Sequence, residues 1–243
     1  MDNNIVSFQK DLEQFKIILD DRKLKQFIQY YDLLVEWNSF MNLTAITEFN
    51  EVLKKHFVDS VSLINAIPDL HEKSYTLIDV GTGAGFPGIP LKIVFPNLKI
   101  TLLDSLNKRV MFLNEVVNIL DFQDITVIHG RAEDYAKPDK LRQSFDICVS
   151  RAVANLTTLS EYCLPFVKKD GHFISYKSEK IVEEFDNAKK AIVKLGGIYE
   201  RQVEFKLPNS DIYRNLFVIR KKNDTPDKFP RKAGIPLKDP IIK

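Results

Sequence analysis

The residues best suited to chemistry are the acid and glycines of Asp79-x-Gly81-x-Gly83-x-Gly85. Glycine tolerates positive φ and has no side chain, so a ligand can approach the backbone closely at these positions. A short apolar run precedes the pattern, and a helical run follows it. A strand, a glycine turn and a helix in this order are typical of a nucleotide-cofactor site.

Asp104 is the next informative residue, because it ends a second apolar run nineteen positions after Gly85. A carboxylate at that point of a βαβ unit can accept both hydroxyls of a cofactor ribose. Two cofactors fit this unit, a nicotinamide dinucleotide and S-adenosylmethionine. The dinucleotide pattern is Gly83-x-Gly85-x-x-Gly88, but Pro87 removes an N–H group that a pyrophosphate needs at the helix N-terminus. Asp79-x-Gly81-x-Gly83-x-Gly85, in which an acid precedes the glycines, is the turn usual in S-adenosylmethionine enzymes. The sequence therefore favours S-adenosylmethionine as the cofactor.

Arg151 is the candidate catalytic residue, because with Ser150 it ends the predicted fourth strand, where a parallel sheet places its ligands. No Asn/Asp-Pro-Pro-aromatic sequence follows to activate an exocyclic amine, and Cys148 lies inside the strand, away from a nucleophile's position. An acceptor such as guanine N7 needs neither a base nor a covalent intermediate, only in-line positioning. His56 and Asp59 lie three positions apart on a predicted helix, and we expect a packing or surface contact from them.

Composition and charge limit the classes of protein that fit. The 243 residues are 44% hydrophobic and 28% charged, which predicts one good core. The chain has no signal-peptide start and no apolar run near the ~18 residues of a membrane span, so we expect a cytoplasmic protein with no membrane partner. Its two cysteines lack metal-ligand spacing, so no metal is expected.

The end of the chain is unusually basic, although the net charge is only +2. Residues 220–243 contain eight Lys or Arg against three Asp, together with four prolines. The prolines should prevent regular structure, and the positive charge suits nucleic-acid phosphates. This segment is therefore predicted to be a mobile basic tail.

The elements that must position these residues follow from the apolar spacing. Residues 5–67 show helical spacing, with Asn50 and Glu51 as the cap of a third helix. From residue 76 onward, strand-like and helix-like segments alternate. Strands are predicted at 76–80, 99–104, 125–129, 145–150, 171–177, 198–205 and 215–220, and helices at 87–95, 107–120, 155–168 and 179–195.

This alternation predicts an α/β fold with a doubly wound, mainly parallel sheet. Only a short Pro-Asn-Ser-Asp connection joins the last two strands, so they should form an antiparallel pair at one edge. Class I S-adenosylmethionine-dependent methyltransferases have this Rossmann-like architecture. The expected organisation is an N-terminal helical extension at 1–70 packed on the core, a methyltransferase domain at 71–222 and the basic tail at 223–243.

Seven motifs occur in order over nearly the whole chain: Trp37-Asn38 with Asn42-Leu43-Thr44, His56 with Asp59-Ser60, Asp79 to Gly88, Asp104 to Arg109, Gly130 to Asp134, Ser150 to Ala154 and Arg231 to Pro236. Together they closely resemble the RsmG family. This family is the bacterial small-subunit rRNA guanine-N7 methyltransferase, also called glucose-inhibited division protein B.

The resemblance implies S-adenosylmethionine as methyl donor and a single guanine in the decoding region of 16S rRNA as acceptor. The partner would be 16S rRNA, the small ribosomal subunit or its precursor, and we expect a monomer. The cofactor contacts predicted from these motifs and from the turn and ribose arguments are Asp79, Gly81, Gly83, Phe86, Asp104, Ala132, Glu133 and Arg151. The residues expected to hold RNA are Lys108, Arg109, Arg231 and Lys232.

Two other interpretations stay open on sequence alone. A nicotinamide-dependent oxidoreductase is disfavoured by Pro87, by the antiparallel finish and by the lack of a paired Tyr-Lys or His-Asp proton donor. A non-catalytic regulator that binds S-adenosylmethionine would carry the same motifs, because a site without an acid or base looks alike whether or not it turns over. Methyl transfer to RNA would distinguish the three.

Overall fold

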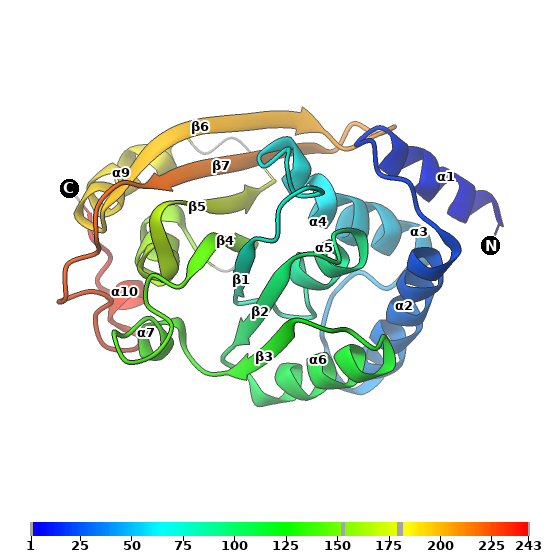
Figure 1. Cartoon of the computed structure of the whole chain (residues 1–243), viewed down its shortest axis with the longest axis horizontal. Helices are drawn as coiled ribbons and strands as arrows, with labels where there is room; N and C mark the ends of the chain where they lie inside the picture. The colour runs from blue at the N-terminus through cyan, green and yellow to red at the C-terminus, as the bar shows by residue number, and fades with distance from the viewer. Residues whose placement is uncertain (1, 152–153, 179–181, 243) are drawn as a thin grey trace.

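A seven-stranded sheet runs through the computed structural model, which describes residues 2–151, 154–178 and 182–242 (Figure 1). The strand order is β3-β2-β1-β4-β5-β7-β6. The strands from β3 to β5 pair with one another in parallel, whereas β7 is antiparallel to both β5 and β6, so the predicted doubly wound sheet with an antiparallel edge pair is confirmed. The strands are β1 (Thr76–Val80), β2 (Lys99–Asp104), β3 (Ile125–His129), β4 (Phe145–Arg151), β5 (Val167–Lys177), β6 (Gly197–Lys206) and β7 (Tyr213–Lys221).

Helices cover both faces of the sheet, each over its own buried apolar cluster. One face carries α1 (Asp2–Glu13), α2 (Asp21–Met41), α3 (Phe49–Val52), a π-helical turn η1 (Leu53–Val58), α4 (Asp59–Val61), a 3-10 turn η2 (Ser62–Asn65), α5 (Gly88–Val94) and α6 (Asn107–Ile119). The other carries α7 (Ala132–Tyr135), α8 (Leu156–Cys163), a 3-10 turn η3 (Leu164–Phe166), α9 (Val182–Lys194) and α10 (Ile235–Lys238). None of the described helices is long and apolar enough to cross a membrane.

Two of the differences from the predicted element boundaries have a clear physical reason. The predicted helix 155–168 ends at Cys163, because Pro165 has no N–H group to continue it, and Val167 already pairs with Phe145 as the start of β5. The third N-terminal helix is capped by the Glu48 side chain, which accepts from the backbone N–H of Glu51, and not by Asn50.

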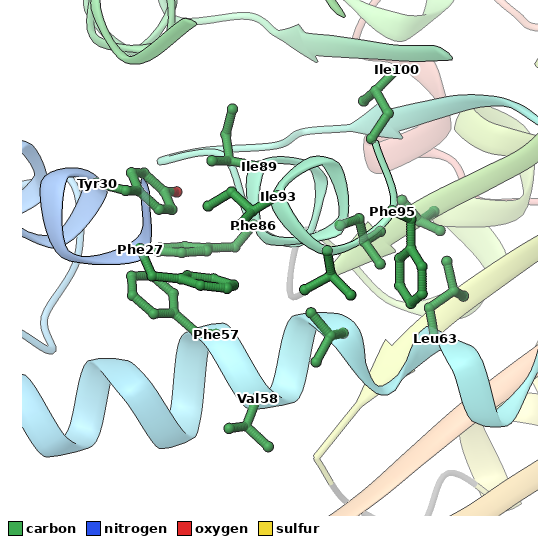
Figure 2. Close-up of a cluster of buried hydrophobic side chains, with 14 of the residues drawn as sticks. Phe27, Tyr30, Phe57, Val58, Leu63, Phe86, Ile89, Ile93, Phe95 and Ile100 are labelled. Atoms are coloured by element: carbon green, nitrogen blue, oxygen red, sulfur yellow. The ribbon is translucent and has the colours of Figure 1, made fainter. Parts of the chain in front are cut away.

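An aromatic cluster joins the N-terminal helices to the glycine turn (Figure 2). The ring of Tyr30 on α2 lies 5.3 Å from that of Phe57 and 5.5 Å from that of Phe86, which follows the turn. Its hydroxyl donates to the carbonyl of Ala84 within the turn. Burial raises the pKa of Tyr30 well above its usual value, so this hydroxyl stays protonated and keeps donating. The N-terminal helices therefore fix the conformation of the turn.

The basic tail is folded onto the protein, so the prediction of a mobile segment without regular structure is wrong. Phe229 and Ile241 are only 6% and 9% exposed, and both belong to the apolar cluster under α8 and α9. The guanidinium of Arg142 donates to the carbonyls of Thr225 and Phe229, and residues 235–238 form α10. The prolines limit the conformations of the unfolded tail, which lowers the entropy lost when its apolar side chains dock.

Candidate active site

The glycine turn lies at the carboxyl end of β1, beside the end of β2. Gly81 and Gly83 both have positive φ, 71° and 64°, in agreement with a turn that only glycine forms easily. A Cβ atom on Gly83 would meet nothing within 4 Å, so this position faces open space. On Gly85 a Cβ would lie 2.6 Å from Cγ1 of Ile89, so packing requires that glycine.

Three neighbouring cavities lie at the carboxyl ends of the parallel strands. The turn cavity, of about 420 Å³, lies against the glycine turn and Asp104. The β3 cavity, of about 210 Å³, follows the ends of β2 and β3 and shares Gly81 with the turn cavity. The β5 cavity, of about 410 Å³, lies at the end of β5 and shares His56 and Arg151 with the turn cavity. The three cavities together form an elongated site. The side chains of His56 and Arg151, which lie between the turn cavity and the β5 cavity, are called the divider.

Asp104 lines the turn cavity, where the ribose argument predicted it. Its Oδ2 accepts from the N–H of Gly83 and its Oδ1 from the N–H of Leu106, each at 2.9 Å. Nη1 of Arg109 lies 3.5 Å from Oδ2, and Arg109 lines the same cavity. Asp104 thus holds the turn in place. Oδ2 accepts from both Gly83 and Arg109, whereas Oδ1 keeps a lone pair that can accept from a ligand hydroxyl.

Asp79 does not line these cavities, so the prediction that it contacts the cofactor is corrected. The side chain is fully buried, and its Oδ2 accepts from Oγ1 of Thr82 at 2.7 Å and from the N–H of Gly88 at 2.9 Å. Burial raises the pKa of Asp79 to about 6. Asp79 therefore holds the glycine turn from its buried side, through Thr82 and Gly88.

Ala132 and Glu133, which are predicted to contact the cofactor, both line the β3 cavity, and the Glu133 carboxylate also accepts a hydrogen bond from the tail. Its Oε1 accepts from the N–H of Gly234 in the tail at 2.9 Å. Leu237 of α10 lines the same cavity, a residue that sequence reasoning missed. Only the docking of the tail brings it there, so no local sequence signal could have identified it.

We expect Leu237→Ala to weaken S-adenosylmethionine binding by roughly 3- to 10-fold, because the leucine is an apolar wall of the β3 cavity, where an adenine ring can lie. The side chain is 62% exposed, so its loss should leave the melting temperature almost unchanged. Calorimetric titration measures the affinity. Ile242→Ala is the matched control, since Ile242 is an exposed apolar residue of the same tail outside the three cavities. Equal affinities for the two variants would contradict this role.

Arg151 lies at the divider between the turn and β5 cavities, with its side chain only 14% exposed. Its Nη1 donates to Oδ2 of Asp59 at 2.8 Å, and its guanidinium lies 5.0 Å from the centre of the Phe86 ring. Asp59 also accepts from Nε of Arg214 at 2.7 Å through its other oxygen. One buried carboxylate is thus shared by two arginines.

His56 completes the divider. Its Nδ1 lies 3.2 Å from Nη2 of Arg151 and its Nε2 lies 2.9 Å from Oγ1 of Thr44, while its ring stacks on Phe86 at 4.4 Å. Nδ1 must accept from the guanidinium, so Nε2 carries the proton and donates to Thr44. His56 and Asp59, for which a packing or surface contact was expected, each contact Arg151 and so belong to one network around it. The helical spacing of His56 and Asp59 was their signal, and Thr44 lay in the motif Asn42-Leu43-Thr44, whereas Arg214 had no sequence signal.

The imidazole of His56 stays neutral in the folded protein. Burial, with the Arg151 guanidinium beside it, lowers its pKa to about 3. We expect His56→Gln to make the protein less sensitive to acid. The unfolded histidine takes up a proton near pH ~6.5, so the stability from the depressed folded pKa is present above that pH and lost below it, at roughly 1 kcal/mol per pH unit. Urea unfolding of both proteins from about pH 7 to about pH 5 tests this, and parallel stability curves would refute it.

The residues predicted to hold RNA are not equivalent in the structure. Lys108 and Lys232 are exposed. Arg231 is not free for phosphates, because its guanidinium donates to Oε1 of the buried Glu161 through Nε at 3.0 Å, to Oε2 through Nη2 at 2.8 Å, and to Asp239 through Nη1. Its placement in the RNA-binding set is therefore corrected, and its structural role is to anchor the tail to α8.

Neither cysteine can act as a nucleophile in the folded protein. Cys148 and Cys163 are fully buried, and burial raises the pKa of the Cys148 thiol well above its usual value. Within the described parts of the chain, no group of three or more His, Cys, Asp or Glu side chains could hold a metal ion.

Comparison with known proteins identifies the family. The family model described as rRNA small subunit methyltransferase G matches residues 23–213. The chain belongs to this family. Ribosomal RNA small subunit methyltransferase G of Lachnoclostridium phytofermentans is 53% identical over 98% of this chain and 97% of its own, and that of Lactococcus lactis subsp. lactis is 48% identical over 96% and 98%. Membership makes the chain an S-adenosylmethionine-dependent rRNA methyltransferase and removes the oxidoreductase and regulator alternatives.

Solved structures agree on the fold. MtNAS superposes with a TM-score of 0.53 at 12% identity over 79% of this chain and 71% of its own. M. jannaschii TYW2, solved in complex with AdoMet, superposes with a TM-score of 0.50 at 15% identity over 67% and 74%. The open face of Gly83 and the carboxylate of Asp104 fit S-adenosylmethionine, because they offer backbone approach and a ribose acceptor in one cavity.

Proposed function

We propose that this methyltransferase modifies N7 of one guanine in the decoding region of 16S rRNA. The observation that supports this most strongly is the state of the titratable groups at the divider. His56 is neutral with both nitrogens bonded, and Asp59 is held by two arginines. Among the described residues that line the β5 cavity, Glu184 is the other carboxylate, and its Oε1 is paired with Nζ of Lys177 at 2.6 Å.

The pairings of His56 and Asp59 suit an acceptor that has no proton to lose, whereas Oε2 of Glu184 has no donor among the described residues. S-adenosylmethionine supplies a methyl group on a positively charged sulfur, which a lone pair can attack in line. Guanine N7 has such a lone pair, so a bond forms from N7 to the methyl carbon as the carbon–sulfur bond breaks, and the base gains the positive charge. Methylation of an exocyclic amine would instead require a group to take the proton. The protein's own contribution is to orient the reactants and exclude water.

Arg151 and Phe86 are the residues proposed to orient the two reactants. Both line the turn cavity, and Arg151 also lines the β5 cavity, so it can contact molecules on both sides. Its fixed ion pair with Asp59 lowers the freedom of the guanidinium before substrate binds. A preorganised group of this kind stabilises the transition state without further ordering cost.

The test is to incubate the protein and labelled S-adenosylmethionine with 16S rRNA, or with small ribosomal subunits, from cells that lack this protein. The expected product is one N7-methylguanosine, which reduction followed by aniline cleaves out of the strand. Primer extension then locates it. Comparison of the two substrates shows whether free RNA or the assembled particle is used. A label that resists cleavage and lies on an exocyclic amine or a ring carbon would overturn the proposal.

A further inference from the structure

The β5 cavity has room and chemistry for a second ligand next to the cofactor. The β5 cavity has a volume of about 410 Å³, and the side chains of His56 and Arg151 separate it from the turn cavity. Small-molecule sites in proteins have volumes in this range. Tyr176 forms part of the wall, and its hydroxyl is fixed by donation to the carbonyl of Ser60 at 2.7 Å. A molecule in the β5 cavity therefore lies against the same His56 and Arg151 side chains that line the turn cavity.

Glu184 of α9 is the polar group best placed to recognise that ligand. Its Oε1 accepts from Nζ of Lys177 and from the N–H of Leu156, the first helical residue of α8. No described residue donates to its Oε2. The side chain is 24% exposed and lines the β5 cavity, so a carboxylate of fixed position is available to accept hydrogen bonds there.

We propose that the β5 cavity binds the acceptor guanine and that Glu184 reads its Watson–Crick edge. Guanine is the RNA base that presents two adjacent donors on this edge, N1–H and the exocyclic amine. Adenine and cytosine present a ring-nitrogen acceptor there, which a carboxylate repels. Enzymes that modify bases commonly take the base out of the stack and read this edge in a pocket. The inference rests on the proposed function, because it concerns the base whose N7 is methylated.

This orientation also places the reacting atom correctly. N7 lies on the side of the purine opposite the exocyclic amine, so a guanine with that amine at Glu184 directs N7 toward the His56–Arg151 divider. Three of the five N–H groups of Arg151 are engaged, by Asp59, by the carbonyl of Lys55 and by Nδ1 of His56. They therefore compete little for the N7 lone pair, which stays free to attack.

The experiment uses RNA in which the target guanine is replaced by inosine, which lacks only the exocyclic amine. Single-turnover methylation is measured at saturating RNA and S-adenosylmethionine. We expect the wild-type protein to prefer guanine by roughly 10- to 100-fold, and Glu184→Gln to reduce this preference to about 3-fold or less. Glu183→Gln is the matched control, because Glu183 is an exposed neighbour on the same helix, and it should keep the preference.

Lys177→Met separates the base contact from the ion pair. It removes the cation from Glu184 but leaves the carboxylate, so the ratio of guanine to inosine rates should stay high. A Glu184→Gln protein that forms N7-methylguanosine with the full wild-type preference would overturn the inference and leave the proposed function intact. A wild-type protein that does not distinguish the two bases would overturn it without any variant. Absence of N7-methylguanosine from the wild-type product would overturn the proposed function itself.

Discussion

Gly83→Val is expected to abolish detectable S-adenosylmethionine binding, a loss of more than ~100-fold in affinity. The Cβ of the new residue would occupy the open space of the turn cavity, where a cofactor must touch the backbone. Its φ of 64° adds strain of about 1–2 kcal/mol for a branched residue. Calorimetric titration with S-adenosylmethionine measures the loss.

The control for that strain is Gly234→Val. Gly234 also has a positive φ, 83°, and a Cβ there also meets nothing within 4 Å, but the residue does not line the turn cavity. Both variants should lose similar thermal stability, whereas only Gly83→Val should lose the cofactor completely. Retention of wild-type affinity by Gly83→Val would show that the cofactor does not approach this part of the turn.

Arg151→Ala should lower the single-turnover rate of methyl transfer by roughly 100- to 1,000-fold, with a much smaller effect on RNA affinity. The guanidinium lies at the divider between the two cavities, where an ordered contact matters most in the transition state. Its removal also leaves Asp59 with Arg214 as its remaining cation. Single-turnover methylation and RNA-binding titrations, carried out on the same preparation, separate the rate from the affinity.

Two further variants test whether the effect is local. Arg214→Ala breaks the other ion pair of Asp59 but does not touch the turn cavity, so it should lose similar stability and less rate. Arg151→Lys keeps a cation for Asp59 without the planar fork, and an intermediate rate is expected. If saturating RNA restored the full rate to Arg151→Ala, Arg151 would belong to the general RNA-binding surface instead.

The sequence alone determined the elements whose conformation depends on local chemistry. The strands at 76–80, 99–104 and 125–129 were predicted with their observed ends, because each is a short, mainly apolar run that a polar residue or glycine ends. The glycine turn was equally predictable, since positive φ favours glycine whatever surrounds it. Asp104 followed from these two, because β1 and β2 pair in register up to Val80 and Leu103.

Only the tertiary structure decided which charged and polar groups meet. Arg151 reaches Asp59 across 92 positions and Arg231 reaches Glu161 across 70, and no local spacing records such pairs. The tail had the composition of a mobile arm, yet Phe229 and Ile241 dock in an apolar cluster that exists only once α8 and α9 have packed. Asp79 had the spacing of a cofactor ligand, but the fold turned its side chain inward. Long-range packing determines which side chains are buried. Burial in turn decides whether a charged group can contact a ligand or forms hydrogen bonds within the protein.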